Sequence, residues 1–110
     1  MRPALITTLP ELRLKYSHEV NVQVYRSAYM AGRAITAMVL TTEYGEQIAT
    51  VSVNLAAYNE YPVDSDHIFV KNYGENEGIM EALIEAGVLS KAVREVPCGY
   101  ETAYECRILI

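Results

Sequence analysis

One segment of this chain has the pattern of a helix, and it stands between segments that have the pattern of strands. From 75 to 86, apolar residues recur at positions i, i+1, i+4 and i+5 on one helical face, and glutamates recur every four residues on the other. Gly87 is placed to end the helix in a left-handed conformation, with Val88 folding back onto Leu83. Gly74 takes the capping position at the start. A single helix among strands restricts the fold to the α+β class.

The remaining regular segments alternate in polarity or are rich in β-branched residues, as strands are. These predicted strands are 12–16, 20–24, 33–42, 47–55, 67–71, 93–96 and 100–109. Short turns between neighbouring strands, two of them containing glycine, make the pairs antiparallel. We therefore expect an α+β fold, an antiparallel sheet of about five to seven strands with one main helix packed on it, and a single domain over residues 1–110.

Composition narrows the class of protein further. Hydrophobic residues make up 51% of the chain, which is the content of a globular protein. No apolar run approaches the ~20 residues of a membrane span, and the N-terminus lacks a signal-peptide pattern. Cys98 and Cys106 are the two cysteines, and so small a number fits a reducing compartment. We expect a cytoplasmic protein, with a Cys98–Cys106 bridge left as the alternative should their Cα atoms approach within about 7 Å.

The residues that usually carry chemistry do not form a known catalytic or metal-binding pattern. His18 and His67 are isolated, and the spacing of Cys98 and Cys106 is that of neither a zinc nor a redox motif. The segment 74–78 precedes a helix as phosphate loops do, but its two glutamates would repel an anion and the lysine is missing. We expect no catalytic residue, no metal and no cofactor. The enzyme alternative requires a pocket that places His67 or Cys98 beside a carboxylate.

Charge is distributed unevenly along the chain. The net charge is −5, yet residues 43–85 hold nine acidic residues against one lysine. An acidic excess disfavours direct nucleic-acid binding. Tyrosines lie among these acids, and a tyrosine offers a protein partner both apolar area and a hydrogen-bonding tip. A solubilising surface is the alternative interpretation. The predicted partner-binding residues are Tyr58, Glu60, Tyr61, Asp64, Asp66, Tyr73, Glu75 and Glu77.

Two stretches resemble a known family. The family consists of short uncharacterised proteins of bacteria, their phages and conjugative elements. It is resembled first by the stretch His67–Val88, which contains Lys71-Asn-Tyr-Gly-Glu-Asn-Glu-Gly78. It is resembled second by the C-terminal end, in Val96–Tyr100 with Cys106–Ile108. The family provides no catalytic residues to transfer. Where the family pattern has a serine before the helix, this chain has Gly74. The family's association with mobile elements implies a protein that inhibits a host defence system, as small acidic anti-CRISPR and anti-restriction inhibitors do.

These observations lead to one functional hypothesis and one alternative. The hypothesis is a non-enzymatic mobile-element protein that inhibits a host defence nuclease of the CRISPR type by binding it through the acidic, tyrosine-containing surface. The alternative is a small adaptor or homodimeric module of a mobile element with no defence role, which associates through an exposed sheet edge.

Overall fold

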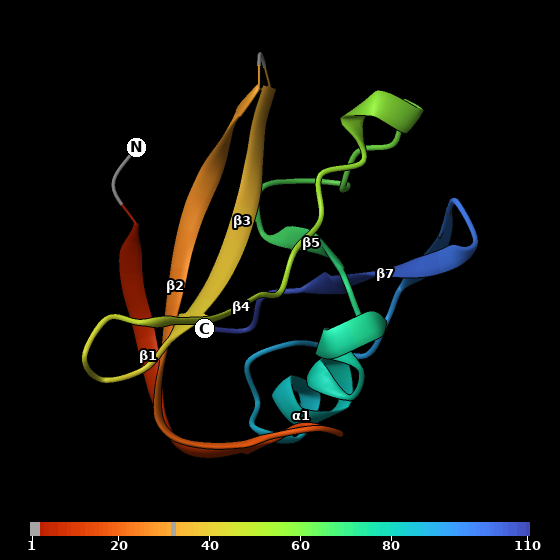
Figure 1. Ribbon diagram of the computed structural model, residues 1–110. Coiled ribbons are helices and arrows are strands. Elements are labelled where there is room, and N and C mark those ends of the chain that lie inside the picture. Colours follow the sequence, from red (N-terminus) through yellow and green to blue (C-terminus); the bar gives the residue numbers. More distant parts are fainter. Residues whose placement is uncertain (1–2, 32) are drawn as a thin grey trace.

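The computed structural model, which describes residues 3–31 and 33–110, contains seven strands and one α-helix within those residues (Figure 1). The strands are β1 (Ala4–Arg13), β2 (His18–Ala31), β3 (Arg33–Thr41), β4 (Gln47–Thr50), β5 (His67–Val70), β6 (Arg94–Cys98) and β7 (Glu101–Arg107). The helix is α1 (Ile79–Glu85), and two short 3-10 helices are η1 (Ala56–Tyr58) and η2 (Gly74–Asn76). The predicted α+β class is confirmed.

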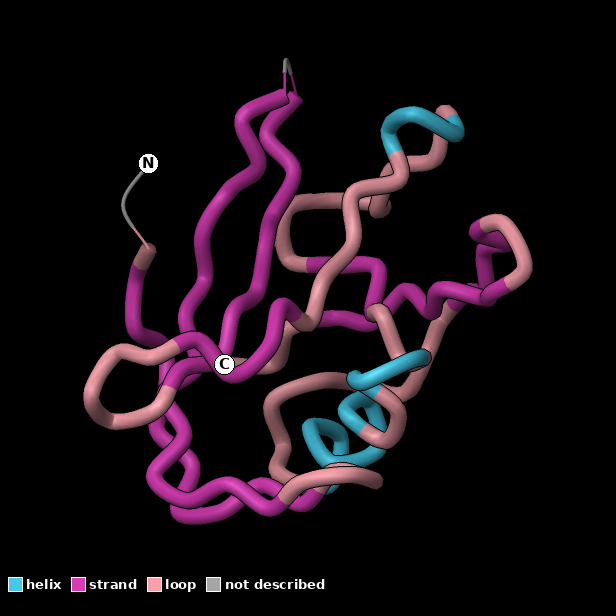
Figure 2. The backbone as a smooth tube through the Cα atoms, viewed as in Figure 1, coloured by secondary structure: helices cyan, strands magenta, loops and turns pink. Residues whose placement is uncertain are grey.

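The strands form two antiparallel sheets that meet through a short connecting segment. One sheet has the order β1-β2-β3-β4 and the other β5-β7-β6. The segment after β4 bonds to both sheets: the Val51 amide donates to the Met38 carbonyl at 2.9 Å, and the Lys71 amide donates to the Val51 carbonyl at 2.8 Å. Ser52 also forms a bridge with Val70. The segment after β4 therefore links the two sheets, and the helical segment lies beside the β1–β2 turn (Figure 2).

The start of the helix differs from the prediction. A single helix is predicted over 75–86 with Gly74 as its cap, whereas η2 ends at Asn76 and α1 begins only after Gly78. Gly78 has a φ of +92°, a backbone conformation that residues other than glycine rarely adopt. The chain turns at this residue before α1 starts. The Asn76 side chain donates to the Thr50 carbonyl at 2.8 Å. That bond holds η2 against β4 and separates it from the helix.

The end of the helix is as predicted. Gly87 has a φ of +78°, the Val88 amide donates to the Leu83 carbonyl at 2.9 Å, and the Gly87 amide donates to the Ile84 carbonyl at 3.0 Å. These are the two bonds of a Schellman motif, so carbonyls left over at the helix end have partners.

Several strand limits also differ from the prediction. β1 begins at Ala4 and ends at Arg13, because the Leu14 amide turns to bond the Ser17 carbonyl at 2.8 Å. The predicted strand over 47–55 ends as β4 at Thr50. The last turn lies after Cys98, since Pro97 and Cys98 both belong to β6.

Two clusters of buried side chains make up the core. The larger one lies between the sheets and α1 and contains Leu9, Leu12, Val22, Val24, Met38, Leu40, Ala49, Val51, Ile68, Val70, Ile79, Leu83, Val88, Leu89, Cys106 and Ile108. The smaller cluster contains Leu55, Phe69, Val96 and Ala103. β5 contributes to both clusters, because successive side chains of a strand point to opposite faces. It is therefore buried on both faces.

Candidate functional site

Four of the predicted partner-binding acids form ion pairs with cations of the same chain. The pairs are Glu60 with Arg94 at 3.3 Å, Asp64 with His67 at 2.7 Å, Asp66 with Arg26 at 3.0 Å, and Glu77 with Lys15. The hydrogen bond from His67 and the amide of Asp66 hold the pKa of Asp64 below its usual value. The hydrogen bond to Glu77 raises the pKa of Lys15. Much of the charge of these acids is thus balanced within the fold.

The loop between η1 and β5 is held by a buried carboxylate that the sequence analysis did not single out. Glu105 of β7 is 2% exposed, and its Oε1 accepts from Nε of Arg94 at 2.9 Å. Its Oε2 accepts from the Val63 amide at 3.0 Å. Arg94 also donates to the Tyr61 carbonyl at 2.9 Å. Glu105 and Arg94 together fix the loop that carries Glu60 to Asp66.

Beside this loop lies a cavity of about 550 Å³ that contains His67. Its lining residues are Tyr61, Val63, His67, Val93, Arg94 and Glu105. His67 lies against the Asp64 carboxylate, so the geometric condition set for the enzyme alternative is met at His67. None of the lining residues is a serine, threonine or cysteine, so the cavity wall offers no aliphatic hydroxyl or thiol nucleophile. Arg94 and Glu105 are engaged with each other.

Two tyrosines of the predicted surface, Tyr58 and Tyr73, lie near each other, and Tyr73 lies beside Cys98. The Tyr73 hydroxyl lies 3.8 Å from the Cys98 sulfur. Burial raises the pKa of Tyr73 to about 12, with further contributions from Cys98, Glu101 and Tyr58. Tyr58 itself is 58% exposed. Tyr73 therefore contacts Cys98, whereas Glu60, Asp64 and Asp66 form ion pairs with cations.

Glu75 belongs to a groove with acids from two other parts of the chain. Glu19 of β2, Glu46 of the β3–β4 turn and Glu75 of η2 line a groove of about 460 Å³ together with Tyr16. Among the side chains of residues 3–29 and 35–110, none of these three carboxylates has a cation as an ion-pair partner. Tyr16 is 70% exposed at its rim. We call this the Glu19–Glu46–Glu75 groove.

Two of these three acids lie in the acidic stretch, and only Glu75 is among the predicted partner-binding residues. Glu75 lies in the acidic stretch 43–85. Glu46 lies near the beginning of this stretch, in a segment for which the sequence predicts a hairpin turn and no binding role. Glu19 lies in residues 1–42, where five basic residues outnumber two acidic ones, so nothing in the sequence links it to the acidic stretch. The pairing of β1 with β2 and of β3 with β4 brings Glu19 and Glu46 to the side of η2.

The two cysteines are free thiols in different surroundings, so the alternative of a bridge is not realised. Cys98 pairs with Glu101, and Cys106 lies five positions further along β7, which is about 16 Å in a strand. Burial raises the pKa of the Cys106 thiol to about 11, whereas Cys98 is only half-buried.

A thiol reagent will distinguish these two cysteines. We expect the folded protein to react with Ellman's reagent at Cys98 and the denatured protein at both cysteines, because Cys106 is 0% exposed. Cys98→Ala should abolish the reaction of the folded protein, and Cys106→Ala should leave it unchanged. No reaction in denaturant without a reductant would mean that the bridge forms.

Two general features of the described residues bear on the class of site. No group of three or more His, Cys, Asp or Glu side chains is arranged among them to hold a metal ion. No helix in this part of the chain is both long and apolar enough to cross a membrane.

No family model, curated protein or solved structure matches the chain. The family resemblance of His67–Val88 therefore stays a sequence-based prediction.

Proposed function

We propose that the protein is a non-enzymatic inhibitor of a host defence nuclease of the CRISPR type, produced by a mobile element, which binds the nuclease through an acidic, tyrosine-containing surface. The observation that carries the proposal is the Glu19–Glu46–Glu75 groove, where three carboxylates have no cation partner among the described residues. A nuclease holds DNA with basic side chains, and unpaired carboxylates are the groups that such side chains attract.

The ion pairs divide the predicted surface by what each part contributes. Glu60, Asp64 and Asp66 are paired within the fold and position the loop, so their charges are weaker attractors. Glu75 is exposed and lies within the groove. In the proposed complex, Glu46 and Glu75 contact the nuclease, and Tyr16 adds apolar area at the rim.

The experiment is a pull-down of individual CRISPR nucleases, with and without guide RNA, followed by a DNA-cleavage assay on each nuclease retained. The test variant is Glu46→Lys with Glu75→Lys. Its matched control is Glu95→Lys with Glu101→Lys, which makes the same change of charge at exposed sites on β6 and β7. We expect the groove variant to lose at least about tenfold in affinity, and the control to retain binding and inhibition.

Three outcomes would contradict parts of the proposal. Equal binding by the groove variant would refute the acidic-surface mechanism. Affinity that does not fall as salt concentration rises would do the same, because exposed charges are screened. If no nuclease is retained, the adaptor function takes its place, and size-exclusion chromatography would then be used to look for self-assembly.

The sheet edges bear on the homodimer version of the alternative. β1 and β6 are each one of the two outer strands of their sheets, the others being β4 and β5, and they contain Pro10 and Pro97. Proline has no N–H and is a common residue at edges that avoid pairing with another copy. Each proline removes one hydrogen-bond donor from its strand, which disfavours continuous pairing of two copies through β1 or β6.

A further inference from the structure

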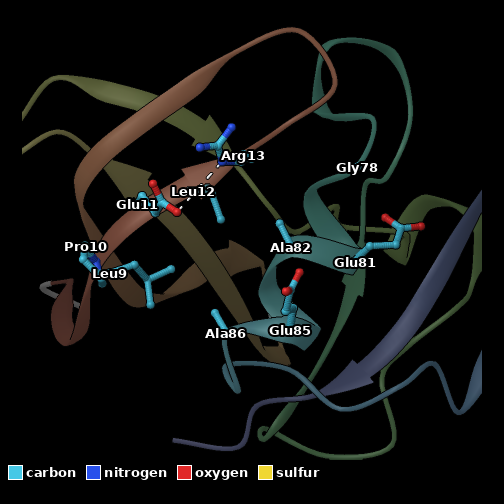
Figure 3. Close-up of a pocket in the computed structure, with 10 residues that line it drawn as sticks. All are labelled: Leu9, Pro10, Glu11, Leu12, Arg13, Gly78, Glu81, Ala82, Glu85 and Ala86. Atoms are coloured by element: carbon cyan, nitrogen blue, oxygen red, sulfur yellow. Dashed lines mark ion pairs between the residues drawn. The ribbon is translucent and has the colours of Figure 1, made fainter.

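A second groove lies between the edge strand β1 and helix α1 (Figure 3). Its volume is about 580 Å³. Leu9 and Leu12 of β1 form a buried floor, and Ala82 of α1 and Ala86, which follows the helix, form the facing wall. An apolar floor with small alanine side chains on the facing wall leaves room for the side chains of a bound peptide.

The β1 side of the groove presents backbone as well as side chains. Every residue from Leu9 to Arg13 lines it, whereas a strand that presented only one face would contribute alternate residues. β1 is the last strand of its sheet, so its outer edge has no strand partner within the described residues. Pro10 removes one donor from this edge but leaves its carbonyls, which an occupant with its own N–H groups can bond.

The charge of the rim specifies the occupant. Glu11, Glu81 and Glu85 stand against Arg13 alone among the lining residues. Glu11 is already paired with His18 at 3.1 Å. Both carboxylate oxygens of Glu81 accept from the neutral Asn72 amide, and this carboxylate points away from β1 (Figure 3). Glu85 lies beside Ala86 at the end of α1, and the last turn of α1 contains no basic residue. The helix side therefore carries negative charge that no cation of the described chain balances.

We infer that the β1–α1 groove binds an extended, basic peptide segment of a partner protein, which adds to the edge of β1 and places a lysine or arginine against Glu85, with Glu81 adding to the negative potential of the helix side. The occupant is extended because one wall is a strand edge, and basic because the other wall is acidic. This inference does not rest on nuclease inhibition. Its variants leave Glu46 and Glu75 in place, so the failure of either proposal can be recognised separately.

The test uses fluorescence anisotropy with a labelled peptide as long as β1, 10 residues, of alternating lysine and valine. A peptide of alternating glutamate and valine is the negative control. Two variants probe the groove: Glu81→Lys with Glu85→Lys reverses its charge, and Ala82→Leu fills it without changing charge. The control variant is Glu95→Lys with Glu101→Lys. Circular dichroism of each variant verifies that it is folded.

We expect the basic peptide alone to bind, and both groove variants to weaken its binding by about tenfold or more while the control variant does not. If Ala82→Leu binds normally, or if the control weakens binding equally, the contact is unspecific attraction and the inference fails. If the basic peptide does not bind, the inference fails as well. A dimer that Ala82→Leu dissociates would show that a second copy occupies the groove instead.

Discussion

Replacing Arg94 with alanine should lower the free energy of unfolding by about 2–3 kcal/mol, far more than most surface substitutions. The reason is the carboxylate that remains. Glu105 is 2% exposed, and Nε and Nη2 of Arg94 lie 2.9 and 2.8 Å from its Oε1. Without Arg94 the buried charge keeps only the Val63 amide. Because the Arg94 side chain is 43% exposed, water offsets part of the loss.

Urea denaturation followed by circular dichroism measures this effect, and two further variants identify its cause. Glu60→Ala removes only the exposed ion pair with Arg94, so its cost should stay below about 1 kcal/mol. Combining Arg94→Ala with Glu105→Leu removes the unpaired charge and should recover part of the stability. If Arg94→Ala unfolds at the same urea concentration as the wild type, the ion pair with Arg94 does not stabilise the buried Glu105 carboxylate.

The same network illustrates what the sequence could and could not predict. The acids at Glu60 and Asp66 are visible in the sequence, but their partners Arg94 and Arg26 are 34 and 40 positions away. No local pattern links residues at such separations, so charges that looked available to a partner turn out to be balanced within the fold. Glu105 lies between Tyr104 and Cys106 in a predicted strand, and nothing in its neighbours indicates that it is buried.

Element types were predictable where a period was present, and limits were not predictable where tertiary contacts set them. The apolar spacing of α1 and the glycine at its end gave the helix and its Schellman motif. Its start was missed because Gly74 and Gly78 are equally good breakers by sequence. The contact of Asn76 with β4, which the sequence does not encode locally, decides between them. The groove acids likewise come together only through strand pairing.

Replacing Phe69 with alanine should cost about 3–5 kcal/mol, the largest effect expected of a single change in this chain. Phe69 is the one phenylalanine in the sequence, is 1% exposed, and is the largest side chain of the smaller core cluster. It contacts a cluster made of Leu55, Val96 and Ala103. The small side chains around it cannot fill the space that its ring would leave.

The position of Phe69 also predicts where the molecule loosens first. Leu55, which precedes η1, belongs to the cluster of Phe69, and the Arg94 guanidinium lies 5.3 Å from the Phe69 ring. Arg94 in turn bonds Glu60 and the Tyr61 carbonyl, so the segment that follows Leu55 is held in part through this ring. In Phe69→Ala, amide hydrogen exchange should therefore accelerate in residues 55–66 more than in β2 and β3, which belong to the larger cluster. Tyr100→Ala, at a fully exposed site, is the control and should change neither stability nor exchange. Uniform acceleration in both sheets would mean that the two clusters unfold as one unit, and that the loop is no less stable than the core beneath it.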